Sequence, residues 1–268
     1  MRRANHILLL LAVLETGCAG MAVRPQTPAR DLSVADMLAV QEVTKDRYFV
    51  LVFGSETKPR LPRFTHTWST VVKVTQLPGC AAPTIEAHTI SWMPASLEIR
   101  PYSPHVEPAT NLDLRQSLDE TLKHHEQVAL WGPYETWYGL YHRFVTQKSY
   151  LESGALGYQC TDAFGEAARL GNGSNCFHAL SDTDPQFDRR QYPLLFYGQP
   201  AALNIVRQIS DRPILIEPTQ THDWLIPALG LDHYPIVRRQ YHGPVKEFSR
   251  EAILEAMSQP PPRRRPLP

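Results

Sequence analysis

Two stretches of the chain alternate between apolar and polar residues with the period of a β-strand. In residues 64–75 one face carries Phe64, His66, Trp68, Val72 and Val74, and in residues 84–93 one face carries Glu86, His88, Ile90 and Trp92. Residues 48–53 form a continuous run of aromatic and β-branched side chains, which is typical of a buried strand. These patterns predict three successive strands, with the two alternating ones as an antiparallel pair and a further short strand at residues 97–100.

Helical spacing follows the strands. Leucines recur every fourth residue within residues 111–127, and an aromatic stripe fills residues 133–153 before Gly154. A third helix is predicted from Cys160 to Gly171, and a fourth at residues 201–209. Strands followed by helices indicate an α+β protein, with an antiparallel sheet packed on helices, in a single domain over residues 47–257.

The first residues have the character of an export signal. Arg2 and Arg3 precede an apolar run at residues 7–14, and small residues surround Cys18. Residues 1–18 look like a bacterial lipoprotein signal in which Cys18 would be lipidated, although Glu15 stands where an aliphatic residue is usual; a simple cleaved signal or a short anchor is the alternative. We therefore expect a periplasmic or cell-envelope protein, possible membrane anchoring through Cys18, a linker over residues 19–46 and a Pro/Arg-rich tail over residues 258–268.

Composition narrows the range of partners. The chain has 27 basic and 27 acidic residues, so its charge gives no reason to expect nucleic acid as a partner. Neither a glycine-rich phosphate loop nor a Gly-x-Ser-x-Gly motif is present, and the histidines lack the usual spacing of zinc ligands. We expect no cofactor and no metal, and keep a metal-dependent hydrolase only as a further alternative because of the loose His124-His125 and His222-Asp223 clusters.

Cys160 is the residue on which the functional interpretation depends. A thiol at the start of a helix feels the positive end of the helix dipole, which favours the thiolate. Thiol catalysis also needs an imidazole base and a group that orients it, and His66 and His88 lie on the apolar faces of neighbouring predicted strands. If the strands pair, the two imidazoles are expected to approach each other; Glu86 is the alternative orienting group.

The segment Tyr158-Gln159-Cys160-Thr161-Asp162 resembles the aromatic-x-Cys-Ser/Thr-acidic motif that opens the catalytic helix of YiiX-like proteins. The order of histidine strands before the cysteine is also similar to the circularly permuted papain-like families, which include the lecithin-retinol-acyltransferase-like proteins. The resemblance covers residues 47–171 and implies a permuted papain-like core with Cys160 as nucleophile, His66 as base and His88 as the third member. Trp68 departs from the family pattern, in which small and aliphatic residues follow the histidine.

The sequence thus predicts a cysteine hydrolase or acyltransferase that acts on an amide or ester of a cell-envelope peptide or lipid. The alternative is a non-catalytic envelope protein in which Cys160 is structural. Disulfide pairing separates the two hypotheses, because a Cys80–Cys176 bond leaves Cys160 free, whereas a Cys160–Cys176 bond removes the nucleophile. The sequence leaves both pairings open and gives no indication of oligomeric state.

Overall fold

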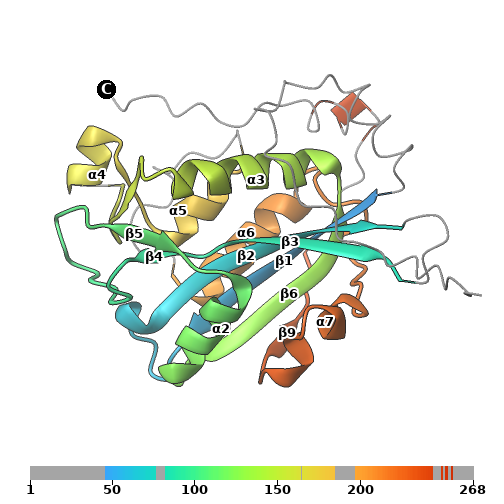
Figure 1. Ribbon diagram of the computed structural model, residues 1–268, viewed down its shortest axis with the longest axis horizontal. Helices are drawn as coiled ribbons and strands as arrows, with labels where there is room; N and C mark the ends of the chain where they lie inside the picture. The colour runs from blue at the N-terminus through green and yellow to red at the C-terminus, as the bar shows by residue number, and fades with distance from the viewer. Residues whose placement is uncertain are drawn as a thin grey trace, which may run out of the picture. The chain divides into compact units, whose positions relative to one another are not determined.

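The computed structural model describes residues 46–76, 82–163, 165–184, 197–243, 249, 251–252 and 255, all within one compact unit. Its centre is a five-stranded sheet of order β3-β2-β1-β6-β9 (Figure 1). The strands are β1 (Asp46–Glu56), β2 (Thr65–Thr75), β3 (Thr84–Ile90), β6 (Gln127–Thr136) and β9 (Val237–Arg239). β1, β2, β3 and β6 are antiparallel neighbours and β9 is parallel to β6, so the α+β class is confirmed and the sheet is mixed. Cys18, Cys80, the export signal and the tail lie outside the described residues.

The β1–β3 strands form where their sequence patterns predict them. The next strands differ from the prediction: β4 (Trp92–Pro94) pairs with β5 (Ala109–Asn111) in a separate two-stranded sheet, and residues 97–100 form no strand. The Leu97 amide donates to the Pro94 carbonyl at 2.9 Å, so the chain turns there instead of extending. A short 3-10 helix, Pro62–Phe64, leads into β2.

β6 is the main element that the periodicity missed. Residues 133–136 belong to this strand and not to the helix, because the backbone from Gln127 to Thr136 pairs with β1. The following helix, α3, therefore begins at Tyr138 and runs to Glu152. α2 (Leu114–Lys123) begins at a capping box in which Asp113 and Gln116 bond each other's backbone amides.

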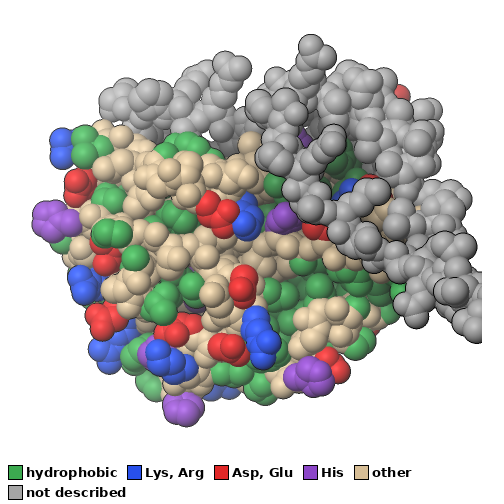
Figure 2. Space-filling model, in the orientation of Figure 1, with side chains coloured by type: hydrophobic (Ala, Val, Ile, Leu, Met, Phe, Trp, Pro, Cys, Tyr) green, Lys and Arg blue, Asp and Glu red, His purple; other side chains and the backbone are tan. Residues whose placement is uncertain are grey.

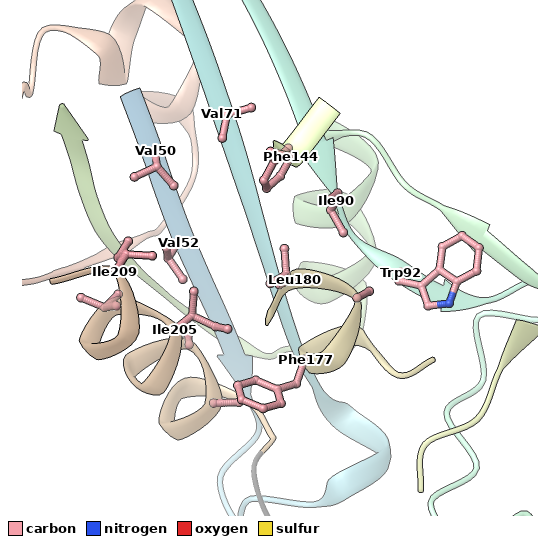
Figure 3. Packing of buried hydrophobic residues seen from close by; sticks show 14 of the residues in the cluster. Val50, Val52, Val71, Ile90, Trp92, Phe144, Phe177, Leu180, Ile205 and Ile209 are labelled. Carbon is pink, nitrogen blue, oxygen red and sulfur yellow. The ribbon is translucent and has the colours of Figure 1, made fainter. Parts of the chain in front are cut away.

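Helices cover both faces of the sheet (Figure 1). One face packs against α3, α5 (Cys176–Ser181) and α6 (Gln199–Ser210), and the other against α2 and α7 (Leu225–Ala228). β1 contributes Val50 and Val52 to the first core and Phe49, Leu51 and Phe53 to the second, which explains its continuous apolar run. Figure 3 shows the first core, in which Phe177 and Leu180 of α5 and Ile205 and Ile209 of α6 face the valines of β1 and β2.

A small parallel pair, β7 (Gly157–Tyr158) and β8 (Gly173–Ser174), frames the Cys160 segment, and α4 (Gly165–Leu170) lies between them in sequence. A Cβ atom on Gly157 would lie 2.4 Å from a methyl group of Val106 and 2.5 Å from the Glu107 carbonyl oxygen, so only glycine fits there. The chain continues beyond α7 through the 3-10 helix Leu231–His233 to β9. No helix in the described ranges combines the length and hydropathy required to cross a membrane.

Candidate functional site

His66 and His88 lie on opposite faces of the sheet, so the expected approach of their imidazoles is wrong. His66 shares the α2 side of β2 with Trp68, whereas His88 is paired with Val71. Directly opposed residues of antiparallel strands share a face, and Val71 belongs to the core on the α3 side. Val71 is five positions from His66, an odd number, which places the two side chains on opposite sides.

His88 is held by neighbours of its own. Its Nε2 lies 2.8 Å from a carboxylate oxygen of Glu86 and 3.1 Å from the Tyr141 hydroxyl of α3. Glu86 therefore contacts His88, as the shared strand face predicts. Within the described ranges, no hydrogen bond joins His88 to His66 or to a cysteine. The predicted role of His88, to orient the His66 imidazole, therefore has no support from its contacts.

Cys160 does not begin a helix. It lies in a turn after β7, and α4 starts only at Gly165, where the Gln159 side chain accepts a hydrogen bond from the Ala167 amide at 2.9 Å. Burial raises the pKa of the Cys160 thiol to about 12, nearby Cys176 and Asp162 raise it further, and a hydrogen bond with Tyr158 opposes the rise. The thiol is therefore protonated at neutral pH, and no described hydrogen bond or ring contact joins it to His66 or His88.

Cys176 occupies the helix start that the sequence analysis assigned to Cys160. It is the first residue of α5, and the N-cap Asn175 accepts a hydrogen bond from the His178 amide at 2.7 Å. Burial raises the pKa of the Cys176 thiol to about 11, although the backbone amides of Thr67, Phe177 and Cys176 itself lower it. Asn175 is the sequence signal that could have predicted this helix start, because asparagine is a favoured N-cap residue.

A buried polar cluster joins the Cys160 turn to α5. Asp162 accepts hydrogen bonds from the Asn175 amide at 3.0 Å and from its side-chain nitrogen at 2.8 Å, and lies 2.5 Å from Nδ1 of His178. The Asn175 side chain also donates to the Cys160 carbonyl at 3.0 Å. The Asp162 and His178 side chains are fully inaccessible to solvent. Such a network fixes the position of the turn, and it offers no open surface to a substrate.

A cavity of about 420 Å³ lies on the α2 side of the sheet. This volume falls in the usual range of small-molecule sites. Its lining combines apolar side chains with histidines, acids and arginines: Arg63, Phe64, His66, Met93, Leu97, Glu98, Ile99, Arg100, Leu112, Ser117, Glu120, Thr121, His124 and Glu126. Of the predicted site residues, the cavity contains His66 only.

His66 lies in this cavity as a neutral side chain. Only 3% of the residue is exposed, its Nε2 lies 2.7 Å from the Ser91 hydroxyl, and its ring stacks on Trp68 at 5.3 Å between centroids. Burial lowers the pKa of His66 to about 3. Its Nδ1 has no hydrogen-bond partner in the described part of the chain. Because buried polar atoms are nearly always paired, this atom marks a position for a further hydrogen bond.

Glu126 is the functional candidate that the sequence analysis missed. It is 8% exposed, and it accepts a hydrogen bond from the Ser55 hydroxyl at 2.5 Å. Burial raises its pKa to about 7; the Ser55 hydrogen bond and nearby His124 lower it, and nearby Glu120 raises it. The side chain is thus divided between acid and carboxylate at neutral pH, a property common at functional sites.

The end of α2 explains how Glu126 reaches the cavity. His125 has a left-handed φ of 56°, its amide donates to the Leu122 carbonyl, and the Glu126 amide donates to the Thr121 carbonyl. This is the hydrogen-bond pattern of a Schellman motif, which reverses the chain at the helix end. The only sequence signal was a glutamate at a helix C-terminus, where the helix dipole disfavours negative charge.

Comparison with known proteins gives no relative: no family model, no curated protein and no solved structure matches the chain. Within the described ranges, no group of three or more His, Cys, Asp or Glu side chains is arranged to hold a metal ion. The α2 cavity is the candidate site that the geometry supports best, because two buried polar side chains, His66 and Glu126, lie in its wall.

Proposed function

We propose that this protein binds a small organic ligand in the α2 cavity and that Glu126 exchanges a proton with it. The observation that carries the proposal is the convergence of two polar side chains, His66 and Glu126, each more than nine-tenths buried, on one cavity. Burying such groups is costly unless a partner compensates for lost hydration. A ligand that bonds Nδ1 of His66 and the carboxyl group of Glu126 supplies that partner.

The lining favours a particular ligand chemistry. The buried polar groups of the lining include the neutral imidazole of His66 and the carboxyl group of Glu126. Glu120 is partly exposed and lies 3.0 Å from Nε2 of His124, and the lining arginines, Arg63 and Arg100, are exposed. Apolar side chains from residues 93–112 and Phe64 form the rest of the wall. A ligand with an aromatic or aliphatic part and a hydrogen-bond donor, such as an amine or an alcohol, matches this distribution of charge.

Glu126 also suggests the reaction class. A carboxyl group with a pKa near 7 is present in both protonation states at neutral pH, which suits a general acid or base. We infer a hydrolysis or transfer reaction at an ester or amide, assisted by this carboxyl group and without a thioester at Cys160. An exported protein of the cell envelope, with envelope peptides or lipids as substrates, remains part of the proposal.

Ligand-observed NMR with three matched probes tests the binding step. Benzylamine and benzyl alcohol are expected to show saturation transfer from the protein, and benzoate is expected to show less because the interior is acidic. Glu126→Ala should remove the benzylamine signal, whereas Glu86→Ala, a glutamate on the opposite face of the sheet, should keep it. Binding of none of the probes, or equal binding by both variants, would overturn the proposal.

Thiol catalysis at Cys176 is the second candidate, because one observation favours it. The Cys176 sulfur lies in the first turn of α5, where three backbone amides, including that of Thr67 next to His66, bond it. A thiol at a helix start is what the permuted papain-like resemblance implies, with Cys176 in place of Cys160; the His66 imidazole faces the other side of the sheet. If this candidate is correct, Cys176→Ala abolishes hydrolysis of an ester and amide panel, and Cys160→Ala and Glu126→Gln do not.

A further inference from the structure

Cys160 and Cys176 each lie two residues beyond a strand of the same parallel pair. The β7–β8 ladder pairs Gly157 with Gly173 and Tyr158 with Ser174, a constant offset of sixteen residues (173 − 157 and 174 − 158). The Gln159 amide donates to the Ser174 carbonyl at 3.3 Å, which continues the ladder by one step. Cys160 and Cys176 are also sixteen positions apart (176 − 160), so each follows the last pair of the ladder by the same number of residues.

The spacing of neighbouring strands suits a disulfide. Paired backbones in a sheet lie about 4.8 Å apart, and disulfides join residues whose Cα atoms are about 4.4–6.8 Å apart. The Asn175 side chain holds the Cys160 carbonyl at 3.0 Å, so the backbone before Cys176 stays close to Cys160 after the ladder ends. Both residues are thiols in the structure, Cys160 half-buried and Cys176 buried.

We propose that Cys160 and Cys176 form an intramolecular disulfide that locks the turn after β7 to the first turn of α5. This proposal does not depend on the α2 cavity, since the cavity lies on the other side of the sheet. It excludes simultaneous thiol catalysis at Cys176, because the bonded sulfur is no longer a nucleophile.

The oxidant is a low-molecular-weight disulfide such as oxidised glutathione. The more accessible Cys160 loses its proton, and its sulfur attacks one glutathione sulfur, which breaks the glutathione S–S bond and releases one glutathione thiolate. Cys176 then loses its proton and attacks the Cys160 sulfur, which releases the second glutathione. The two cysteines lose two protons and two electrons, and the oxidised glutathione takes up both the protons and the electrons to become two molecules of reduced glutathione. The raised pKa of each thiol makes the exchange slow at neutral pH and faster at alkaline pH.

Peptide mapping tests the bond directly. The protein carrying Cys18→Ser and Cys80→Ser retains only these two cysteines, and it is equilibrated with oxidised glutathione at pH 8.5, alkylated while denatured, and digested with trypsin. Cleavage after Arg169, which lies between the cysteines, should yield two peptides joined by a disulfide. Two separately alkylated or separately glutathionylated peptides would overturn the proposal.

Single variants and heat provide the controls. Cys160→Ser, at the half-buried position, should abolish the linked peptides. Treatment of the oxidised parent with dithiothreitol should lower its melting temperature by roughly 5 °C, since closing a loop of this length stabilises a protein. The same treatment should not shift the Cys160→Ser melting temperature. An equal shift in both proteins, or no shift in the parent, would contradict a lock between the turn and α5.

Discussion

The Asp162 cluster under α5 and the α2 cavity each contain a buried histidine and a buried acidic residue, yet their surroundings differ. Asp162 accepts hydrogen bonds from Asn175 and His178, and no open space adjoins its inaccessible side chain. In the α2 cavity, Nδ1 of His66 has no partner among the described residues, and about 420 Å³ of space adjoins it. The cavity therefore separates the two regions: a buried polar group beside open space can bond a ligand, whereas one enclosed by its neighbours stabilises the fold.

Removing the centre of the paired cluster should have the largest effect on stability. Asp162→Ala leaves the Asn175 amide and the His178 imidazole buried without their acceptor. We expect a loss of about 3–5 kcal/mol in the free energy of unfolding, measured by urea denaturation. A loss below about 1 kcal/mol would show that the cluster does not hold the turn to α5.

The buried Glu126 of the α2 cavity should make the free energy of unfolding depend on pH. Burial raises the pKa of Glu126 to about 7 from its ordinary value of 4.5, so the folded state binds more protons than the unfolded state between these pH values. The free energy of unfolding therefore falls as pH rises through this window, by at most about 3 kcal/mol. Glu126→Gln should remove this fall and be more stable than the parent at pH 8. Urea denaturation of the parent and of Glu126→Gln at pH 5 and pH 8 measures this difference. An equal pH dependence in both proteins would show that Glu126 does not have a raised pKa.

A smaller effect on stability is expected in β7, the strand that leads into the Cys160 turn. Gly157→Ala introduces a Cβ against Val106 and the Glu107 carbonyl, and the backbone of β7 must shift. We expect the free energy of unfolding, measured by urea denaturation, to fall by about 2 kcal/mol. The change should disturb the segment that carries Cys160 and should leave the α2 cavity unaffected. Benzylamine binding should stay intact; its loss in this variant would mean that the two regions are not independent.

The smallest effect is expected at His88. Its hydrogen bond with Glu86 is partly exposed, and such surface contacts contribute little to stability. His88→Ala should change the free energy of unfolding by less than about 1 kcal/mol and should leave ester and amide hydrolysis, if found, unchanged. A loss of hydrolysis with an unchanged fold would restore the predicted catalytic role of His88.

The position of a strand, and the residues that share each of its faces, could be predicted from the alternation of apolar and polar residues within that strand. The alternation in residues 64–75 and 84–93 gave the correct faces within β2 and β3, and the apolar run gave β1. The relation between the strands depends on their pairing register, which alternation within one strand does not determine. An odd offset between His66 and the partner of His88 was therefore enough to separate the two histidines.

The candidate site was less predictable because local backbone geometry decides it. Glu126 enters the cavity through the left-handed turn at His125, a conformation that non-glycine residues rarely adopt. Cys160 carried the expected motif, but the helix start formed at Cys176, where Asn175 caps it. Residues 133–136 joined β6 because pairing with β1 buries Tyr134, which outweighs their helical periodicity.

The parallel edge strand has a consequence for the order of assembly. The β9 residue Val237 pairs with Ala129 across 108 positions (237 − 129), whereas β1, β2 and β3 pair with their neighbours in sequence. Contacts between residues so distant in sequence form late, so β6 remains an open sheet edge while the rest of the chain is synthesised. A chain that ends before Val237 keeps this edge permanently open, and an open edge is a template for pairing with another molecule. β9 therefore covers this edge only after residues 237–239 have been synthesised, and a chain truncated before Val237 is expected to self-associate more readily than the full chain.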